Sequence, residues 1–352
     1  MYKYIGGEFG RVRIEKTIDE KIVFCDNVKY LMSGRTAMHT IMKDILAQNK
    51  ISSVYMPSYC SRSMIEPIHD CGLKTKFYPV NIDKTGIIYD YDFNNECDCI
   101  ILMDYFGYCS EDLPNIAIAE RKNGKIIVVD ITQSLLCDRT YENFADYTLV
   151  SYRKWLPSSA AKAYSSKPFV FKVDEKINSK YETLRNSGFA TINDEGYCSD
   201  ILDNSETILR SDYIGYMASK NEISYVLNFD YHNAKNVRRK NAINLTNMLK
   251  NIECKNIQLI YNEVKQCDCP LYVPIIIGQS IDRNKVLNEL ISQQIECYIH
   301  WGFSKFHNIK HKNDLLYTSE LSLFCDQRYD DDDMKRIVEV LNKTINMPVV
   351  KK

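Results

Sequence analysis

The chain has 352 residues, of which 45% are hydrophobic, and its 45 basic and 46 acidic residues leave a formal net charge of -1. This balance excludes the broad positive field with which proteins bind nucleic acid or anionic membranes. No apolar run approaches the ~20 residues that span a bilayer, and the first residues lack the apolar segment of a secretory signal, so we expect a cytoplasmic protein. Because the chain is too long for a single small core, we also expect two lobes.

Helices and strands alternate over roughly the first third of the chain. Apolar side chains spaced three and four residues apart predict helices at 36–48, 63–71 and 112–124. Runs rich in Ile, Val and aromatic residues predict strands at 53–57, 74–80, 99–107, 125–135, 147–152 and 168–173. Near-continuous apolar strands alternating with helices are typical of parallel sheets covered on both faces, so we predict an α/β fold with a mostly parallel central sheet.

The pattern changes after about residue 175. A polar helical stretch is expected at 206–250, and later strands and helices are expected at 257–261, 270–278, 282–294, 295–301 and 330–345. This set predicts a smaller C-terminal α/β domain. We place a large domain at 1–230, with an N-terminal segment that can contact the small domain, and the small domain at 231–352. His300 and Trp301 end one of its strands, where they either line a pocket or pack as an aromatic cluster.

Thirteen cysteines are scattered along the chain. The Cys-x-Cys pairs Cys97/Cys99 and Cys267/Cys269 lack the Cys-x-x-Cys spacing of zinc knuckles. We interpret most cysteines as reduced, small hydrophobic side chains and assign no metal ligand, with a metal site as the alternative.

Polar residues follow the predicted parallel strands, at the edge where open α/β sheets bind ligands. Asp130 ends one apolar strand, and Lys154 follows the next. The sequence SGRTA opens the first helix, where backbone N–H groups and the helix dipole favour phosphate. Each feature has a simpler explanation: Ser33 or Thr36 as a helix cap, Asp130 as a turn residue, and Lys154 as a surface lysine.

In combination, these features match the requirements of pyridoxal 5'-phosphate (PLP). This cofactor needs an anchor for its phosphate, an acid beside its ring nitrogen and an amine for its aldehyde. Arg153, next to Lys154, would disfavour a second positive charge and so favour the neutral, nucleophilic amine.

Several segments resemble the sugar aminotransferases of the DegT/DnrJ/EryC1/StrS group, which have the fold-type-I architecture of PLP enzymes. They are SGRTAM (33–38), VYMPSYC (54–60), VVDITQSL (128–135), SYRKWLP (151–157) and LSLFCDQRYDDDDMKRI (321–337). The resemblance implies a homodimeric transaminase of polysaccharide biosynthesis. It would move an amino group from glutamate to a nucleotide-linked keto-sugar through a Schiff base at Lys154.

The resemblance also implies roles for individual residues. Lys154 and Asp130 would be catalytic, with Asp130 paired to the pyridine nitrogen, and Gln133 would contact the 3-oxygen of the cofactor. The residues around the phosphate would be Gly34, Arg35, Thr36 and Ser151. Tyr105 or Phe106 would line the pocket.

Departures from the family pattern leave a second hypothesis open. The segment after the lysine, SSAAKAY (158–164), has no glycine, and Ser61 stands where an aromatic residue usually stacks on the ring. Residues 212–224 lack the Asn-x-Arg with which a neighbouring subunit completes the phosphate site. The alternative is therefore a catalytically altered or inactive homologue that acts as a binding or regulatory subunit.

A third hypothesis is a metal-dependent nucleotide-sugar transferase that does not need Lys154. The sequence gives it little support, because MDY (103–105) lacks the Asp-x-Asp spacing that such enzymes often use.

Overall fold

The computed structural model of the protein describes residues 3–11, 25–195, 199–252, 256–307 and 315–346. Its large sheet has seven strands in the order β1-β9-β8-β7-β6-β2-β3. The strands are β1 (Val28–Leu31), β2 (Ser53–Pro57), β3 (Lys74–Tyr78), β6 (Cys99–Met103), β7 (Ile126–Asp130), β8 (Tyr147–Ser151) and β9 (Ala161–Ser165). The adjacent strands β3, β2, β6, β7 and β8 are all parallel to one another. Strand β9 runs antiparallel to both of its neighbours, β8 and β1. The predicted mostly parallel sheet is confirmed.

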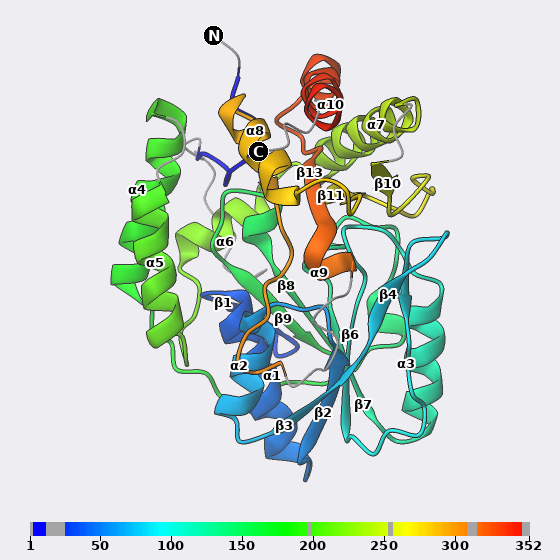
Figure 1. The fold of residues 1–352 in the computed structure, drawn as a ribbon. Coiled ribbons are helices and arrows are strands. Elements are labelled where there is room, and N and C mark those ends of the chain that lie inside the picture. The colour runs from blue at the N-terminus through cyan, green and yellow to red at the C-terminus, as the bar shows by residue number, and fades with distance from the viewer. Residues whose placement is uncertain (1–2, 12–24, 196–198, 253–255, 308–314, 347–352) are drawn as a thin grey trace.

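Helices cover both faces of this sheet (Figure 1). The connection from β2 to β3 and the connection from β6 to β7 move in opposite directions across the sheet. Because such crossovers are right-handed, their helices, α2 (Arg62–Asp70) and α3 (Asp112–Lys122), lie on opposite faces. Helix α1 (Gly34–Gln48) packs beside α2. The central strand β6 is consequently buried along its whole length.

A second, four-stranded sheet lies above the first in Figure 1. Its strands are antiparallel, in the order β10 (Ile257–Leu259), β11 (Tyr272–Ile277), β13 (Glu320–Phe324) and β12 (Cys297–Tyr298). Its helices are α7 (Tyr231–Lys250), α8 (Arg283–Ser292), α9 (Leu315–Ser319) and α10 (Asp331–Ile345). The chain after residue 230 thus forms a second α/β unit, while the proposed domain boundary stays a prediction.

The remaining helices and strands belong to neither of these two sheets. Strands β4 (Val80–Ile82) and β5 (Ile87–Tyr89) form a hairpin. Helices α4 (Ser179–Glu195) and α5 (Ser199–Ser211) lie side by side at the left of Figure 1 and are followed by α6 (Lys220–Leu227). Within the described ranges, no helix is both long and apolar enough to cross a membrane.

The N-terminal segment joins the second unit. Ile5 pairs with Ile295, and the Gly6 N–H donates to the Tyr329 hydroxyl at 2.7 Å. The Arg328 guanidinium donates to the Glu8 carbonyl at 2.9 Å. These contacts fix the position of Glu8, whose side chain takes part in the electrostatics described below.

The strand expected at 168–173 is wrong, because the antiparallel strand of this region is β9, at Ala161–Ser165. The carboxylate of Asp44, from α1, accepts the N–H groups of Val170 and Phe171, both at 2.7 Å. These backbone donors are therefore satisfied by a side chain instead of a neighbouring strand.

Other expected elements have different limits. The single helical stretch expected at 206–250 is divided among α5, α6 and α7. One interruption contains Gly215 at φ +81°, a left-handed backbone that favours glycine. The strands expected at 99–107 and 125–135 end at Met103 and Asp130, so the residues after them form loops at the sheet edge.

We expect Asp44→Ala to destabilise the protein by about 3 kcal/mol, because buried donors lose their acceptor. Asp44 is fully buried, and its Oδ2 also accepts from the Tyr147 hydroxyl at 2.8 Å. Urea unfolding measures the loss. Asp174→Ala is the matched control, since its exposed pair with Lys176 should contribute less than about 1 kcal/mol. Equal stability of the two variants would contradict the assigned role of Asp44.

Candidate functional site

A cavity of about 310 Å³ opens where β6, β7 and β8 end. Six of the seven catalytic and cofactor-binding residues predicted from the sequence line it, and the seventh, Thr36, does not; the six are Gly34, Arg35, Asp130, Gln133, Ser151 and Lys154. Leu271, Tyr272, His300 and Trp301 of the second unit line it as well. The cavity therefore lies between the two units, at the edge of the sheet where ligands of parallel α/β folds bind.

The start of α1 provides donors for an anion. The Ser33 side chain caps the helix by accepting the Thr36 N–H at 3.2 Å, which leaves the N–H groups of Gly34 and Arg35 without intrahelical acceptors. An added Cβ on Gly34 would lie 3.1 Å from the Ser151 Cβ, so glycine keeps this cradle open. Arg35 binds Glu66 at 2.7 Å, while its buried Nε has no described partner. An anionic ligand would satisfy these donors.

Thr36 lies behind this cradle. It is fully buried, and its hydroxyl donates to the Tyr213 carbonyl at 2.9 Å. Its role in the structure is to fix the start of α1 and not to line the cavity. Tyr105 and Phe106, expected at the pocket, are also buried outside its lining.

Asp130 ends β7 with only 5% of its surface exposed. Its Oδ1 accepts the Thr132 N–H at 2.8 Å, and no cationic side chain among the described residues forms an ion pair with it. Burial raises the pKa of this carboxyl to about 6, although the bonds from Thr132 lower it. A cationic group in the cavity would supply the missing counter-charge.

Lys154 lies in the 3-10 turn Tyr152–Lys154 that directly follows β8. The turn is held by the next residue, because the Trp155 indole donates to the Thr132 carbonyl at 2.7 Å. The amine lies 5.2 Å from the centre of the Tyr298 ring and has no hydrogen bond or ion pair with the described residues.

Nearby acids do not neutralise this amine, because arginines bind them. Glu206 pairs with Arg153, and Glu8 pairs with Arg185. Burial, together with the charge of Arg153, lowers the pKa of Lys154 to about 8, although Glu8 and Glu206 oppose this shift. The neutral amine is therefore far more abundant near pH 7 than in an ordinary lysine.

Gln133 is oriented by one backbone contact. Its side-chain oxygen accepts the Phe106 N–H at 2.6 Å. Since a backbone N–H can only donate, the amide nitrogen is left as the donor of this side chain. That orientation suits an oxygen atom of a ligand in the cavity.

Sequence reasoning missed part of the lining. Glu206 and Tyr272 carry no local signal, because a single acid on a helix and an aromatic residue in a strand are common. His300 and Trp301 fulfil both roles considered for them. They line the cavity, and they also pack against other aromatic rings, with Trp301 5.2 Å from Tyr59 and His300 5.2 Å from Tyr272 between ring centres.

We expect Lys154 to react with a small amine reagent at a lower pH than other lysines. Only the neutral amine is nucleophilic, so trace acetylation should fall as pH drops through about 8. Peptide mass spectrometry over a pH series measures this midpoint. Lys176 is the control, since its hydrogen bond to Asp174 raises its pKa. A Lys154 midpoint as high as that of Lys176 would contradict the electrostatic description.

Comparisons with known proteins identify the fold. No family model and no curated relative matches the sequence. Solved structures do match: a DegT DnrJ EryC1 StrS aminotransferase from Brucella abortus shares 15% identity at a TM-score of 0.59, with 91% of this chain and 86% of that chain covered. The PLP form of the putative sugar aminotransferase Spr1654 from Streptococcus pneumoniae also shares 15% identity, at a TM-score of 0.65, with 90% of this chain and 86% of that chain covered.

A structure of DesI in the presence of its TDP-sugar product shares 13% identity at a TM-score of 0.62, with 91% of this chain and 81% of that chain covered. The resemblance drawn from the sequence is thus confirmed at the level of the fold. The chain has the fold of the DegT/DnrJ/EryC1/StrS sugar aminotransferases.

Proposed function

We propose that the protein is a PLP-dependent aminotransferase that moves an amino group from glutamate to a nucleotide-linked keto-sugar. One observation carries this proposal. A buried carboxylate without a cationic partner and an amine with a lowered pKa, Asp130 and Lys154, line one cavity together with an anion cradle.

The residues of the cavity fit PLP in their chemistry. Bound PLP supplies an aldehyde that condenses with primary amines and a ring that withdraws electrons. Gly34, Arg35 and Ser151 would hold its phosphate, and Asp130 would hold the proton on its ring nitrogen. Gln133 would donate to its ring oxygen. No step of this assignment requires Thr36.

Lys154 would have two tasks. Its neutral amine would hold the aldehyde before the donor enters, because a pKa near 8 leaves roughly a tenth of it unprotonated at pH 7. Once displaced, the amine can accept a proton from the donor α-carbon and return it. A group whose pKa lies near the working pH exists in both of the forms that this task needs.

The type of acceptor is suggested by the solved structures and by the cavity wall. The DesI structure was determined with a TDP-sugar. Tyr272, His300 and Trp301 line the cavity on the side of the second unit. Aromatic side chains of this kind can pack against a sugar or a nucleobase, which supports a nucleotide-linked keto-sugar as the acceptor.

A second candidate function is a binding or regulatory subunit without transaminase activity. Ser61 favours it, because this residue lines the cavity where the family usually provides a stacking aromatic ring. The glycine-free segment after Lys154 is held in place by Glu222. The Ser159 N–H donates to the Glu222 carboxylate, which also pairs with Arg11 at 2.6 Å.

The visible absorption spectrum separates the two functions. We expect the protein mixed with PLP and freed of excess cofactor to be yellow, and glutamate should shift this band as the amino group is transferred. Lys154→Ala should lose both signals, because it lacks the amine that holds the aldehyde. Lys162→Ala, a β9 lysine outside the cavity, is the matched control and should keep both signals.

A further variant tests the phosphate cradle within the same experiment. Gly34→Ala would press on Ser151 and should weaken PLP binding by about 10- to 100-fold while leaving Lys154 intact. A colourless wild-type protein in excess PLP would refute the aminotransferase. A yellow protein that does not respond to any amino donor would support the second candidate function.

We also propose the homodimer, the cytoplasmic location and the role in polysaccharide biosynthesis that the resemblance implies. Large apolar side chains at Val170, Ile177 and Ile214 are about half exposed, which is consistent with a covered face. Light scattering of the purified protein should give twice the chain mass of 41.0 kDa. A single-chain mass at micromolar concentration would contradict the dimer.

A further inference from the structure

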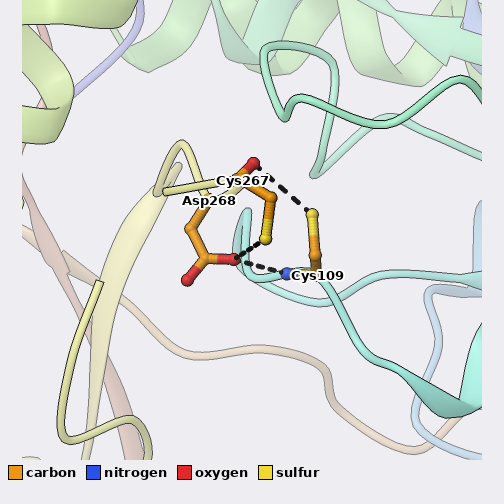
Figure 2. A group of neighbouring side chains, drawn as sticks. All are labelled: Cys109, Cys267 and Asp268. Carbon is orange, nitrogen blue, oxygen red and sulfur yellow. Dashed lines mark hydrogen bonds between the residues drawn. The ribbon is translucent and has the colours of Figure 1, made fainter. Parts of the chain in front are cut away.

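A cluster of metal-binding side chains lies away from the cavity described above. Cys109 and Cys267 come from segments 158 residues apart, and Asp268 follows the second of them (Figure 2). One ligand atom from each of the three residues lies within 4.8 Å of the others. The spacing along the sequence gave no sign of this group, because Cys109 stands far from the Cys267/Cys269 pair.

The backbone holds the two segments together. The Cys269 N–H donates to the Gly107 carbonyl at 3.0 Å, and the Leu271 N–H donates to the Phe106 carbonyl at 2.8 Å. Gly107 has φ +84°, and an added Cβ would lie 2.2 Å from the Cys269 carbonyl. Glycine is therefore required for this approach, and the cluster is placed by the fold and not by mobile side chains.

Within the cluster, backbone groups orient the carboxylate while the thiols have weaker contacts. Asp268 accepts the N–H of Cys109 at 2.8 Å (Figure 2). It also accepts the N–H of Lys265 at 2.8 Å. The Cys267 thiol contacts the same carboxylate at 3.6 Å, and the Cys109 thiol contacts the Cys267 carbonyl at 3.5 Å. Thiols are weak donors, so these contacts leave both sulfurs free to act as ligands once their protons are lost.

A second cavity, of about 510 Å³, adjoins the cluster and includes Cys109 and Asp268 in its wall. It shares no lining residue with the first cavity. This space adjoins two of the three proposed ligand residues, although Cys267 does not line it, and it has room for a water molecule. Cys137 is not part of the three-residue group, and its thiol donates to the Gly107 carbonyl at 3.2 Å.

We propose that Cys109, Cys267 and Asp268 bind one divalent zinc ion, with a water from the adjoining cavity as the fourth ligand. Two sulfurs and one carboxylate oxygen suit the ligand preferences and tetrahedral geometry of zinc, and they suit magnesium and calcium poorly. The bound ion has two Zn–S bonds and two Zn–O bonds, one to the Asp268 carboxylate and one to the water, and binding releases the two thiol protons and the ion's other waters to solvent. The ion would link the loop after β6 to the loop before β11, and this role does not depend on the proposed transaminase.

The test uses the full-length protein and measures metal without reference to activity. After exposure to equimolar zinc and gel filtration, elemental analysis should find about one zinc per chain. Cobalt added to the metal-free protein should give the near-ultraviolet band of cobalt–thiolate bonds. A wild-type chain that retains no zinc, or that binds cobalt without this band, would overturn the proposal without any variant being needed.

Variants then assign the ligands. Cys109→Ser combined with Cys267→Ser should lower retained zinc by about tenfold or more and abolish the cobalt–thiolate band. Cys71→Ser, a partly buried cysteine outside the group, is the matched control and should leave both unchanged. Retention of the band by the double-cysteine variant, or a Cys109–Cys267 disulfide in protein kept under reducing conditions, would refute the assignment.

Discussion

The proposed chemistry depends on how buried charges are paired around Lys154. Two carboxylates, Glu8 and Glu206, lie close enough to influence the amine, and either could neutralise it by direct pairing. Each is instead bound by an arginine, Arg185 or Arg153. Because guanidinium groups form strong paired contacts with carboxylates, they compete well for these acids. The amine is left unpaired in a buried site, where its neutral form is favoured.

The fold brings the other half of the site to the same place. Parallel strands β7 and β8 end side by side, so Asp130 and the turn that holds Lys154 reach one cavity. The start of α1 adds an anion cradle. The second unit closes the cavity with Tyr272, His300 and Trp301. In the proposed function, the first unit would provide the catalytic residues and the second unit would provide the aromatic side chains that contact the acceptor.

The sequence predicted the features that depend on local patterns. Apolar strands and strand-end polar residues follow from periodicity, and capping narrowed the start of the first helix to Ser33 or Thr36. These features predicted the sheet and six of the residues that line the cavity. The features that were missed depend on contacts between distant segments. The backbone at 168–173 bonds to the Asp44 carboxylate instead of forming the expected strand. Glu206 of α5 lines the cavity, and Cys109 contacts Cys267, which is 158 residues away in the sequence. No local sequence pattern predicts such long-range contacts.

The central claim is that Lys154 and Asp130 act on opposite ends of one PLP molecule. A crystal structure of the protein with PLP tests this most directly. The account predicts continuous density between the Lys154 Nζ and the former aldehyde carbon, with the ring nitrogen within hydrogen-bonding distance of the Asp130 carboxylate. A cofactor joined to another lysine, or a ring whose nitrogen points away from Asp130, would contradict it.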